Sequence, residues 1–309
     1  MSTNQRIFYA CQGVAIANSG TAIGSYGVNN MVHGVQQVGV TTNFKLEQAF
    51  ELGQIEIYEN IEGVPEVEVT MEKDIDGWPL IYLMATTGVY QSSNSGLVAR
   101  SKQRCDIRIG IFDEAANNIA SSTTNGGAAE VEIACTGMFV GSLSYKIPVE
   151  GNCSESLTFV GNNKTWLTGG SVAISDTMAN YFDGNDAPPA IKYSTTNPAS
   201  GLIQRRQHVM LQNCVLPKSI KGVVGTGVGN GYDSTNNVNY VHLQSVSIST
   251  DFSRQDLFEL GRKTPFYRPA NFPIEVKCDI EAITTSGDFV FASELGDSTL
   301  FSTYASGEN

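Results

Sequence analysis

The chain has 309 residues, with 31 acidic and 19 basic side chains, so its formal net charge is −12 at pH 7. This balance argues against a protein that grips nucleic acid, because neutralising phosphates requires clustered Lys and Arg. The 41% hydrophobic content favours packed cores over wholesale disorder. No apolar run approaches the ~20 residues that cross a bilayer, so we expect no membrane insertion.

The N-terminal sequence MSTNQRIFYACQGVAIANSG lacks the basic start and apolar core of a secretory signal, which predicts a reducing, cytoplasmic setting. The cysteines are far apart, with no C-x-x-C pair and no His at metal-ligand spacing. We therefore expect free thiols, several of which lie in strand-like runs and act there as small buried hydrophobes; the six are Cys11, Cys105, Cys135, Cys153, Cys214 and Cys278.

In chain order, residues 8–16 read as an extended segment, and a small polar loop follows at 18–30. Val38, Val40, Thr42 and Phe44 then alternate along one face of a strand. A short helix is expected next, with Asn43 as its cap and Gly53 at its end. Further strands are expected at 66–72, 78–84, 105–112, 131–140 and 157–160, separated by polar turns such as 117–127.

An internal repeat organises the chain. Residues 36–53, QQVGVTTNFKLEQAFELG, align without gaps with residues 244–261, QSVSISTDFSRQDLFELG. The identical positions in the first copy are Gln36, Val38, Thr42, Phe44 and the whole run 50–53, which is far more than chance supplies. The second copy predicts the same strand, a helix opened by Ser253 and Asp256 and ended by Gly261, and a strand at 274–283.

The repeat predicts a mainly β fold: two tandem antiparallel β-sandwich or barrel domains, each with one short helix. We place the first domain at 1–170 and the second at 171–309. The second begins with a long Asn-, Asp-, Ser-, Thr- and Pro-rich loop at 171–207, followed by an extended segment at 208–216. Only 26 residues follow Ile283, so either the second domain is reduced or residues from 131–207 complete it.

The sequence contains few residues or motifs typical of catalytic, cofactor or metal sites. His33, His208 and His242 each lie among apolar or strand-like residues, and neither H-E-x-x-H nor G-x-S-x-G occurs. The run GVVGTGVGNG at 222–231 does not fit G-x-G-x-x-G, and the turn at 74–77 lacks the later ligands of a calcium loop. We expect no catalytic residue, no cofactor and no metal site.

One acidic stretch stands out between Glu51 and Asp76, where Lys73 is the counter-charge. An ordinary solvated face would explain it. The alternative is that Glu66 and Glu68 project from one strand face into a water-filled space shared by several subunits, where they would repel a polyanion.

The long stretches GVQQVGVTTNFKLEQAFELGQIEIYENIEGVPEVEVTMEKDIDGWPLIY, GSLSYKIPVEGNCSESLTFVGNNKTW and FELGRKTPFYRPANFPIEV resemble tail tube and virion structural proteins of tailed bacteriophages. The resemblance implies a non-enzymatic subunit, assembled in the host bacterial cytoplasm, that forms stacked rings through which DNA passes without specific binding. Sheath, baseplate and tail terminator proteins are the further partners it implies.

Because rings of this family are typically sixfold, two repeat units per chain favour a trimer with pseudo-sixfold symmetry, with a hexamer as the competitor. Glu66 and Glu68 are then the candidates for facing the lumen. The candidates for contacts between rings or subunits lie in the loops 18–30 and 222–231 and just beyond; they are Ser25, Tyr26, Asn29, Gly225, Gly227, Gly229 and Tyr232. The competing class is a virion decoration or receptor- and glycan-binding module that uses the loop 171–207.

Overall fold

The computed structural model describes residues 12–27, 30–53, 55–76, 78–87, 100–112, 129–174, 203–206, 232–233, 238–239 and 241–284. The elements in these ranges are, in chain order, β1 (Gln12–Asn18), η2 (Ile23–Ser25), β2 (Val35–Asn43), β3 (Leu46–Phe50), β4 (Ile57–Glu62), β5 (Glu66–Asp74), α1 (Ile81–Thr87), β6 (Cys105–Ile111), β7 (Val131–Pro148), β8 (Ser154–Gly161), β9 (Asn163–Thr168), η5 (Gly169–Ser171), β10 (Tyr232–Asp233), β11 (Val238–Asn239), β12 (Val241–Asp251) and β13 (Val276–Thr284).

The chain divides into two compact units whose ranges interleave. Unit 1 comprises Met1–Ser144, Ser154–Ile203 and Ser249–Val276, and unit 2 comprises Tyr145–Cys153, Gln204–Ile248 and Lys277–Asn309. The predicted division at residue 170 stays a prediction.

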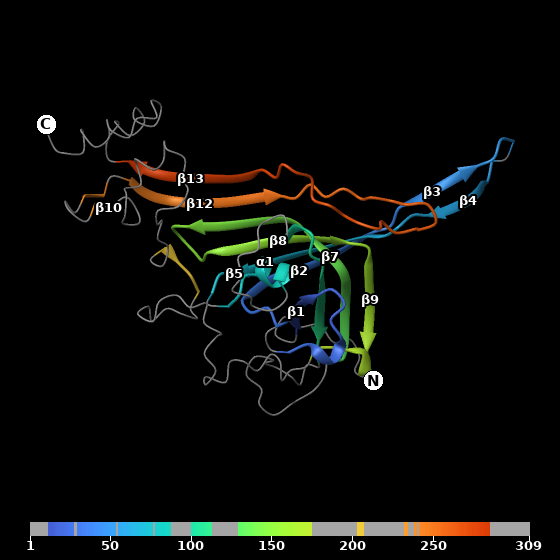
Figure 1. Cartoon of the computed structure of the whole chain (residues 1–309), viewed down its shortest axis with the longest axis horizontal. Coiled ribbons are helices and arrows are strands. Elements are labelled where there is room, and N and C mark those ends of the chain that lie inside the picture. Colours follow the sequence, from blue (N-terminus) through green and yellow to red (C-terminus); the bar gives the residue numbers. More distant parts are fainter. Residues whose placement is uncertain are drawn as a thin grey trace. The chain divides into compact units, whose positions relative to one another are not determined.

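Unit 1 is built on a curled antiparallel sheet with the strand order β1-β6-β7-β8-β5-β2 (Figure 1). β5 is its clearest strand, since Val67, Val69 and Met71 are buried while the intervening residues are not. Strict alternation of this kind buries one face of a strand and leaves the other toward solvent. The mainly antiparallel β fold that the sequence predicts is confirmed.

The core of unit 1 lies against the inner face of this sheet. Ile16, Ile107, Met138, Leu157 and Phe159, from the four strands β1, β6, β7 and β8, are at most 1% exposed. A second, smaller cluster packs around Tyr26, Met31, Phe112 and Ile174. Because both clusters join strands distant in sequence, apolar burial fixes the register of the sheet.

Glu132 is a buried charge of unit 1 with an oppositely charged partner. Glu132 of β7 is fully buried; its carboxylate accepts hydrogen bonds from Arg108 Nη1 at 2.5 Å and from the amides of Ala173 and Ile174 at 2.7 and 3.0 Å. These bonds compensate for the loss of water around the carboxylate, and they pin residues 173–174 to the sheet.

In unit 2, the described residues form strands and short connections. β10 and β11 pair as Tyr232 with Asn239 and Asp233 with Val238. The amide of Val149 donates to the Gln244 carbonyl, and the Ser245 hydroxyl donates to the Glu281 carboxylate at 3.0 Å. β12 pairs with both β7 and β13.

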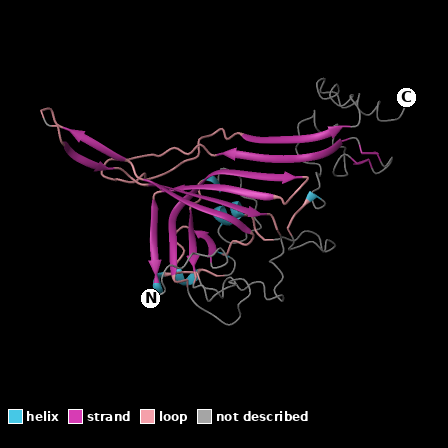
Figure 2. Cartoon of the chain, turned by 180° about the vertical axis from the view of Figure 1, so that it is seen from behind, coloured by secondary structure: helices cyan, strands magenta, loops and turns pink. Residues whose placement is uncertain are grey.

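The predicted helix after the first repeated strand is wrong. Residues 46–50 form β3, which pairs with β4 from Leu46–Glu62 to Phe50–Ile57. Gly53, with φ of +97°, lies in the turn between them instead of ending a helix. Figure 2 draws β3 and β4 as a two-stranded ribbon.

The predicted helix in the second copy is also wrong. The described residues 251–275 contain no helix. The Ser253 amide donates to the Asp251 carboxylate at 2.7 Å, and Ser253 has a positive φ of 43°, so this turn bends the chain instead of opening a helix. Asp256, expected in the helix cap, pairs with Arg268. Leu257 and Tyr267 then bridge an irregular hairpin.

The strand predicted at 78–84 is wrong as well, because α1 begins there at Ile81. Ile81, Met84 and Ala85 are buried on one face at helical spacing. The Glu155 carboxylate of β8 accepts the Ile81 and Tyr82 amides at 2.6 and 3.2 Å, which satisfies donors that a helix leaves unpaired at its start.

The other strand predictions fare better. β5, β6, β8 and β13 lie where the alternation placed them, and β7 is longer than predicted. The repeat is visible in the pairing, since β2 pairs with β5 in the first copy and β12 with β13 in the second. The predicted strand at 208–216, the turn at 117–127 and most of the loop 171–207 lie outside the described residues.

Candidate functional site

The polar outer face of β2, β5 and β8 is the strongest candidate site. On β5, Glu66 and Glu68 are half-buried and Glu72 is exposed, while Val67, Val69 and Met71 point into the core. Glu68 stands opposite Thr41 of β2 on one side and Val160 of β8 on the other. The predicted placement of Glu66 and Glu68 on one strand face therefore agrees with the observed alternation.

Glu66 and Glu68 line a pocket of about 300 Å³ together with residues from β8, β7, the end of β12 and the segment that follows it. Its other lining residues are Gly141, Ser142, Thr158, Val160, Asp251, Arg254, Asp256 and Arg268. All belong to unit 1. The pocket thus has a mixed charge, because its lining includes the carboxylates of β5 and two arginines that were not among the expected site residues.

Arg254 holds the segment after β12 on the sheet. Its Nε donates to the Val140 carbonyl at 2.7 Å and its Nη1 to the Arg268 carbonyl at 2.9 Å. The guanidinium lies 4.8 Å from the centre of the Phe139 ring, within cation–π range. Burial lowers the pKa of Arg254 to about 10, so the guanidinium remains charged at neutral pH.

Arg268 is held by an acidic partner. Its Nε lies 2.5 Å from one oxygen of Asp256, and its Nη2 donates to the other at 3.0 Å. This two-point pairing fits the fork shape of a guanidinium. Lys45 Nζ also lies 3.7 Å from a carboxylate oxygen of Glu66, but their side chains are 70% and 42% exposed, so the pair contributes little to stability.

The outer face carries carboxylates among small polar residues. Its strand positions carry Glu66, Glu68 and Glu72 among small polar residues such as Thr41 and Thr70. Within the described ranges, no group of three or more His, Cys, Asp or Glu side chains could hold a metal ion. Among the described residues, no helix is long and apolar enough to span a membrane.

The cysteines that the structure describes have no disulfide. Cys105, Cys135 and Cys153 are buried, and Cys278 is exposed. Burial raises the pKa of the Cys105 thiol and raises that of Cys135 to about 11, so both stay protonated at neutral pH. Cys105, Cys135 and Cys153 agree with the predicted role as small buried hydrophobes, whereas Cys278 of β13 does not, because it is exposed.

The residues predicted to make contacts between rings or subunits differ in exposure, and only some of them are among the described residues. Ser25 is exposed at the end of η2, whereas its neighbour Tyr26 is 4% exposed, with the Arg108 guanidinium 4.9 Å above its ring. Tyr232 lies in β10 of unit 2. Asn29, Gly225, Gly227 and Gly229 lie outside the described residues, and so does the whole loop 222–231.

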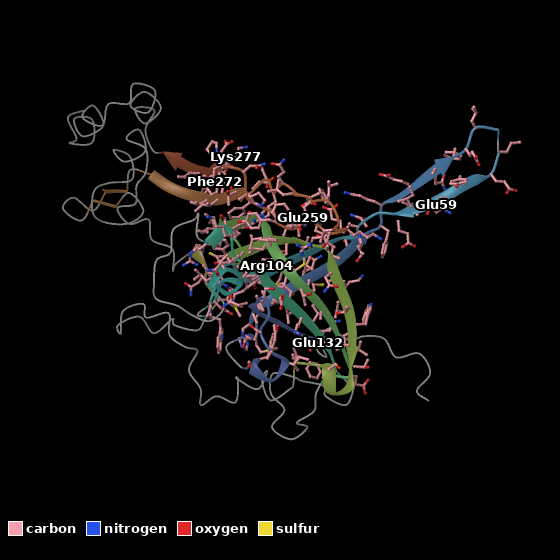
Figure 3. All side chains as sticks on the ribbon, turned by 45° about the vertical axis from the view of Figure 1, so that its right-hand side comes forward. Glu59, Arg104, Glu132, Glu259, Phe272 and Lys277 are labelled. Carbon is pink, nitrogen blue, oxygen red and sulfur yellow. The ribbon has the colours of Figure 1, made fainter. Side chains whose placement is uncertain are left out.

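A second surface is the β3–β4 ribbon, whose first strand lies where a helix was expected. Every described side chain of β4 is exposed, and so are all those of β3 except Ala49. Large apolar side chains on and beside the ribbon are exposed by 43% to 103%; they are Phe44, Leu46, Phe50, Leu52, Ile55, Ile57, Tyr58 and Ile61. Figure 3 shows side chains standing out from both sides of the ribbon, with Glu59 labelled.

The sequence carries only part of the signal for this ribbon. Ile55, Glu56 and Ile57 alternate after Gly53 as in a strand, but residues 46–52, LEQAFEL, do not alternate. Residues 46–52 also fit a short amphipathic helix, so the repeat does not distinguish a helix from a hairpin here.

No protein-family model and no curated protein matches the chain. Among solved structures, the tube-terminating cap of the anti-feeding prophage is 15% identical, covers 55% of this chain and 95% of its own, and has a TM-score of 0.35. A chain of the sheath–tube complex of the extracellular contractile injection system PVC, in its extended state, is 10% identical, with coverages of 54% and 95% and a TM-score of 0.33.

An Hcp protein is 9% identical to this chain, covers 51% of it and 98% of its own length, and has a TM-score of 0.25. The structural neighbours therefore include a tube-terminating cap, a chain of a sheath–tube complex and an Hcp protein. At these identities and TM-scores the likeness assigns no function to this chain.

Proposed function

We propose that this chain is a structural protein that assembles with copies of itself into stacked rings, forming the tube of a phage-type tail through which DNA passes. The observation that carries the proposal is the exposed β3–β4 ribbon. Leu52 and Ile55 at its tip are 103% and 102% exposed, which is unfavourable for a protein that remains a monomer in water.

Physical chemistry supports a role for the ribbon in assembly. A two-stranded hairpin alone is marginally stable in water, and its open edges can pair with another chain. Burying a Leu or Ile side chain contributes about 1.5–3 kcal/mol. A contact between copies would cover apolar side chains and could pair an edge of the ribbon at the same time.

The acidic outer face of β5 supports the role as a conduit. A tube that lets DNA slide must not bind phosphates, and carboxylates repel them. We therefore propose that Glu66 and Glu68 face the lumen, and that exposed Glu72, farther along the same face, contributes to the same surface.

The internal repeat supports three chains per ring. Two copies of the strand-and-turn unit per chain would give six equivalent positions in a trimer, so we keep the trimer with pseudo-sixfold symmetry ahead of a hexamer. Ser25, Asn29, Tyr232, Gly225, Gly227 and Gly229 remain the candidates for contacts between rings or subunits, with Tyr26 supporting its loop from within. Sheath, baseplate and terminator proteins are the proposed further partners.

Negative-stain electron microscopy of the purified, concentrated full chain tests the proposal. We expect rings or hollow tubes whose averaged end views show sixfold symmetry with a threefold modulation. Sedimentation velocity over a range of concentrations gives the number of chains per ring. Discrete monomers at every concentration would contradict the proposal and would favour a decoration or receptor-binding module instead.

A further inference from the structure

The two copies of Phe-Glu-Leu-Gly form two exposed turns in the same chain. Leu52 and Leu260 are 103% and 104% exposed, and Phe50 and Phe258 are 67% and 62% exposed. Gly53 and Gly261 both adopt a positive φ, of 97° and 85°. The same apolar residues are thus held toward solvent at two places, although the elements around them differ.

The first of these turns is strongly acidic. We name residues 50–53 and 55–59 the acidic tip. Its charged residues are Glu51, Glu56 and Glu59, all exposed. Across residues 46–62 every charged residue is a glutamate, with Glu47 and Glu62 completing the set. Any partner of the acidic tip must therefore cover apolar side chains and bring positive charge.

The second turn has that combination. We name residues 258–264 the basic tip. Arg262 and Lys263 directly follow Gly261 and are exposed. Glu259, labelled in Figure 3, lies 3.5 Å from Arg262, and both side chains are 52% exposed. An exposed ion pair of this kind contributes little to stability, so Arg262 can leave Glu259 for another acidic partner at a small cost in free energy.

Each tip therefore offers what the other requires: the same Phe and Leu side chains with charges of opposite sign. In the described structure both tips are exposed, so neither is covered by its own chain. A second copy of the chain carries the complementary tip. Contacts between two different surfaces of identical chains repeat around a ring when the rotation closes.

We propose, resting on the ring assembly proposed above, that the acidic tip of one copy docks against the basic tip of the next copy. Leu52 and Ile55 pack against the apolar side chains at Leu260, and the glutamates of the acidic tip face Arg262 and Lys263. Because each copy carries one tip of each kind, every copy makes the contact twice.

Charge reversal tests this contact with the full chain. The variant Glu56→Lys/Glu59→Lys makes both tips positive, and Arg262→Glu/Lys263→Glu makes both negative. Each should raise the concentration needed for assembly about tenfold or more, because like charges then face each other. The variant with all four changes exchanges the two signs and should assemble within about threefold of the wild type. Sedimentation velocity at about 0.1 M salt provides the measurement.

Matched controls separate this contact from the change in net charge. Glu130→Lys/Glu150→Lys and Lys102→Glu/Arg104→Glu reverse exposed charges outside the tips. Circular dichroism should show that all variants fold, since the changed side chains are exposed. If the wild type assembles and the tip variants behave like the controls, or if the fourfold variant is not restored, the tip contact is wrong and the ring proposal stands. If the wild type remains monomeric, the ring proposal fails, and the tip contact fails with it.

Discussion

His33 is a buried imidazole whose pKa lies below its ordinary value. Its ring lies against Trp78 with centroids 4.0 Å apart, and the fully buried Lys73 donates from Nζ to the His33 carbonyl at 2.7 Å and to Asp76 at 2.9 Å. Burial, and then the positive charge of Lys73, lowers the pKa of His33 to about 4 from 6.5. The imidazole is thus neutral in the folded chain throughout the mildly acidic range.

This shift predicts a loss of stability in mild acid. Between pH 6.5 and 4 the unfolded chain binds a proton at His33 that the folded chain does not. The free energy of unfolding should therefore fall as the pH falls, by about 3 kcal/mol over this window. Urea unfolding of dilute protein at several pH values measures it. In His33→Phe, which keeps a ring and cannot titrate, that part of the fall should vanish; an unchanged slope would contradict the assignment.

At the scale of elements, β8 and β7 approach closely at Gly161, which has no side chain. Gly161 ends β8 and pairs with Val67 of β5. A Cβ built on Gly161 would overlap the sulfur of Met138, a fully buried residue of β7. The glycine therefore allows the two strands to pack at this distance.

Gly161→Ala should lower the free energy of unfolding by about 1–3 kcal/mol, because Met138 must leave its packed position to admit the methyl group. Chemical denaturation of the dilute protein provides the value. Gly170→Ala is the matched control, since a Cβ there meets nothing within 4 Å. Equal stabilities of the two variants would show that the core absorbs the methyl group without cost.

At the scale of the whole molecule, the proposed lumen predicts how charge affects DNA. Glu66→Lys/Glu68→Lys adds cations to a pocket that already contains Arg254 and Arg268. Tubes of this variant should retain duplex DNA at low salt at least tenfold more strongly than wild-type tubes, and the retention should weaken steeply with salt. Co-sedimentation of labelled DNA with assembled tubes measures this.

Glu130→Lys/Glu150→Lys changes the net charge by the same amount and serves as the control for DNA retention. If both variants release DNA as readily as the wild type, Glu66 and Glu68 do not face the path of the DNA. Electron microscopy of the same samples checks that the tubes are intact.

The sequence alone determined much of the sheet. Glu66–Asp74 and Cys105–Ile111 are strands where alternating or continuous apolar residues predicted them, because the pattern along a strand reports directly which side chains are buried. It also placed Glu66 and Glu68 on one strand face. The internal repeat predicted matching strands in both halves, and β2–β5 and β12–β13 supply them.

Only the tertiary structure decided the elements that depend on distant residues. Helix α1 begins where Glu155, 74 residues away, accepts the Ile81 amide. The pocket beside Glu66 exists because Arg254 binds the Val140 carbonyl, 114 residues away. Residues 46–50 fit a helix or a hairpin locally, and pairing with β4 selected the hairpin. Local periodicity contains no information about such partners, and tertiary contacts override weak local propensities.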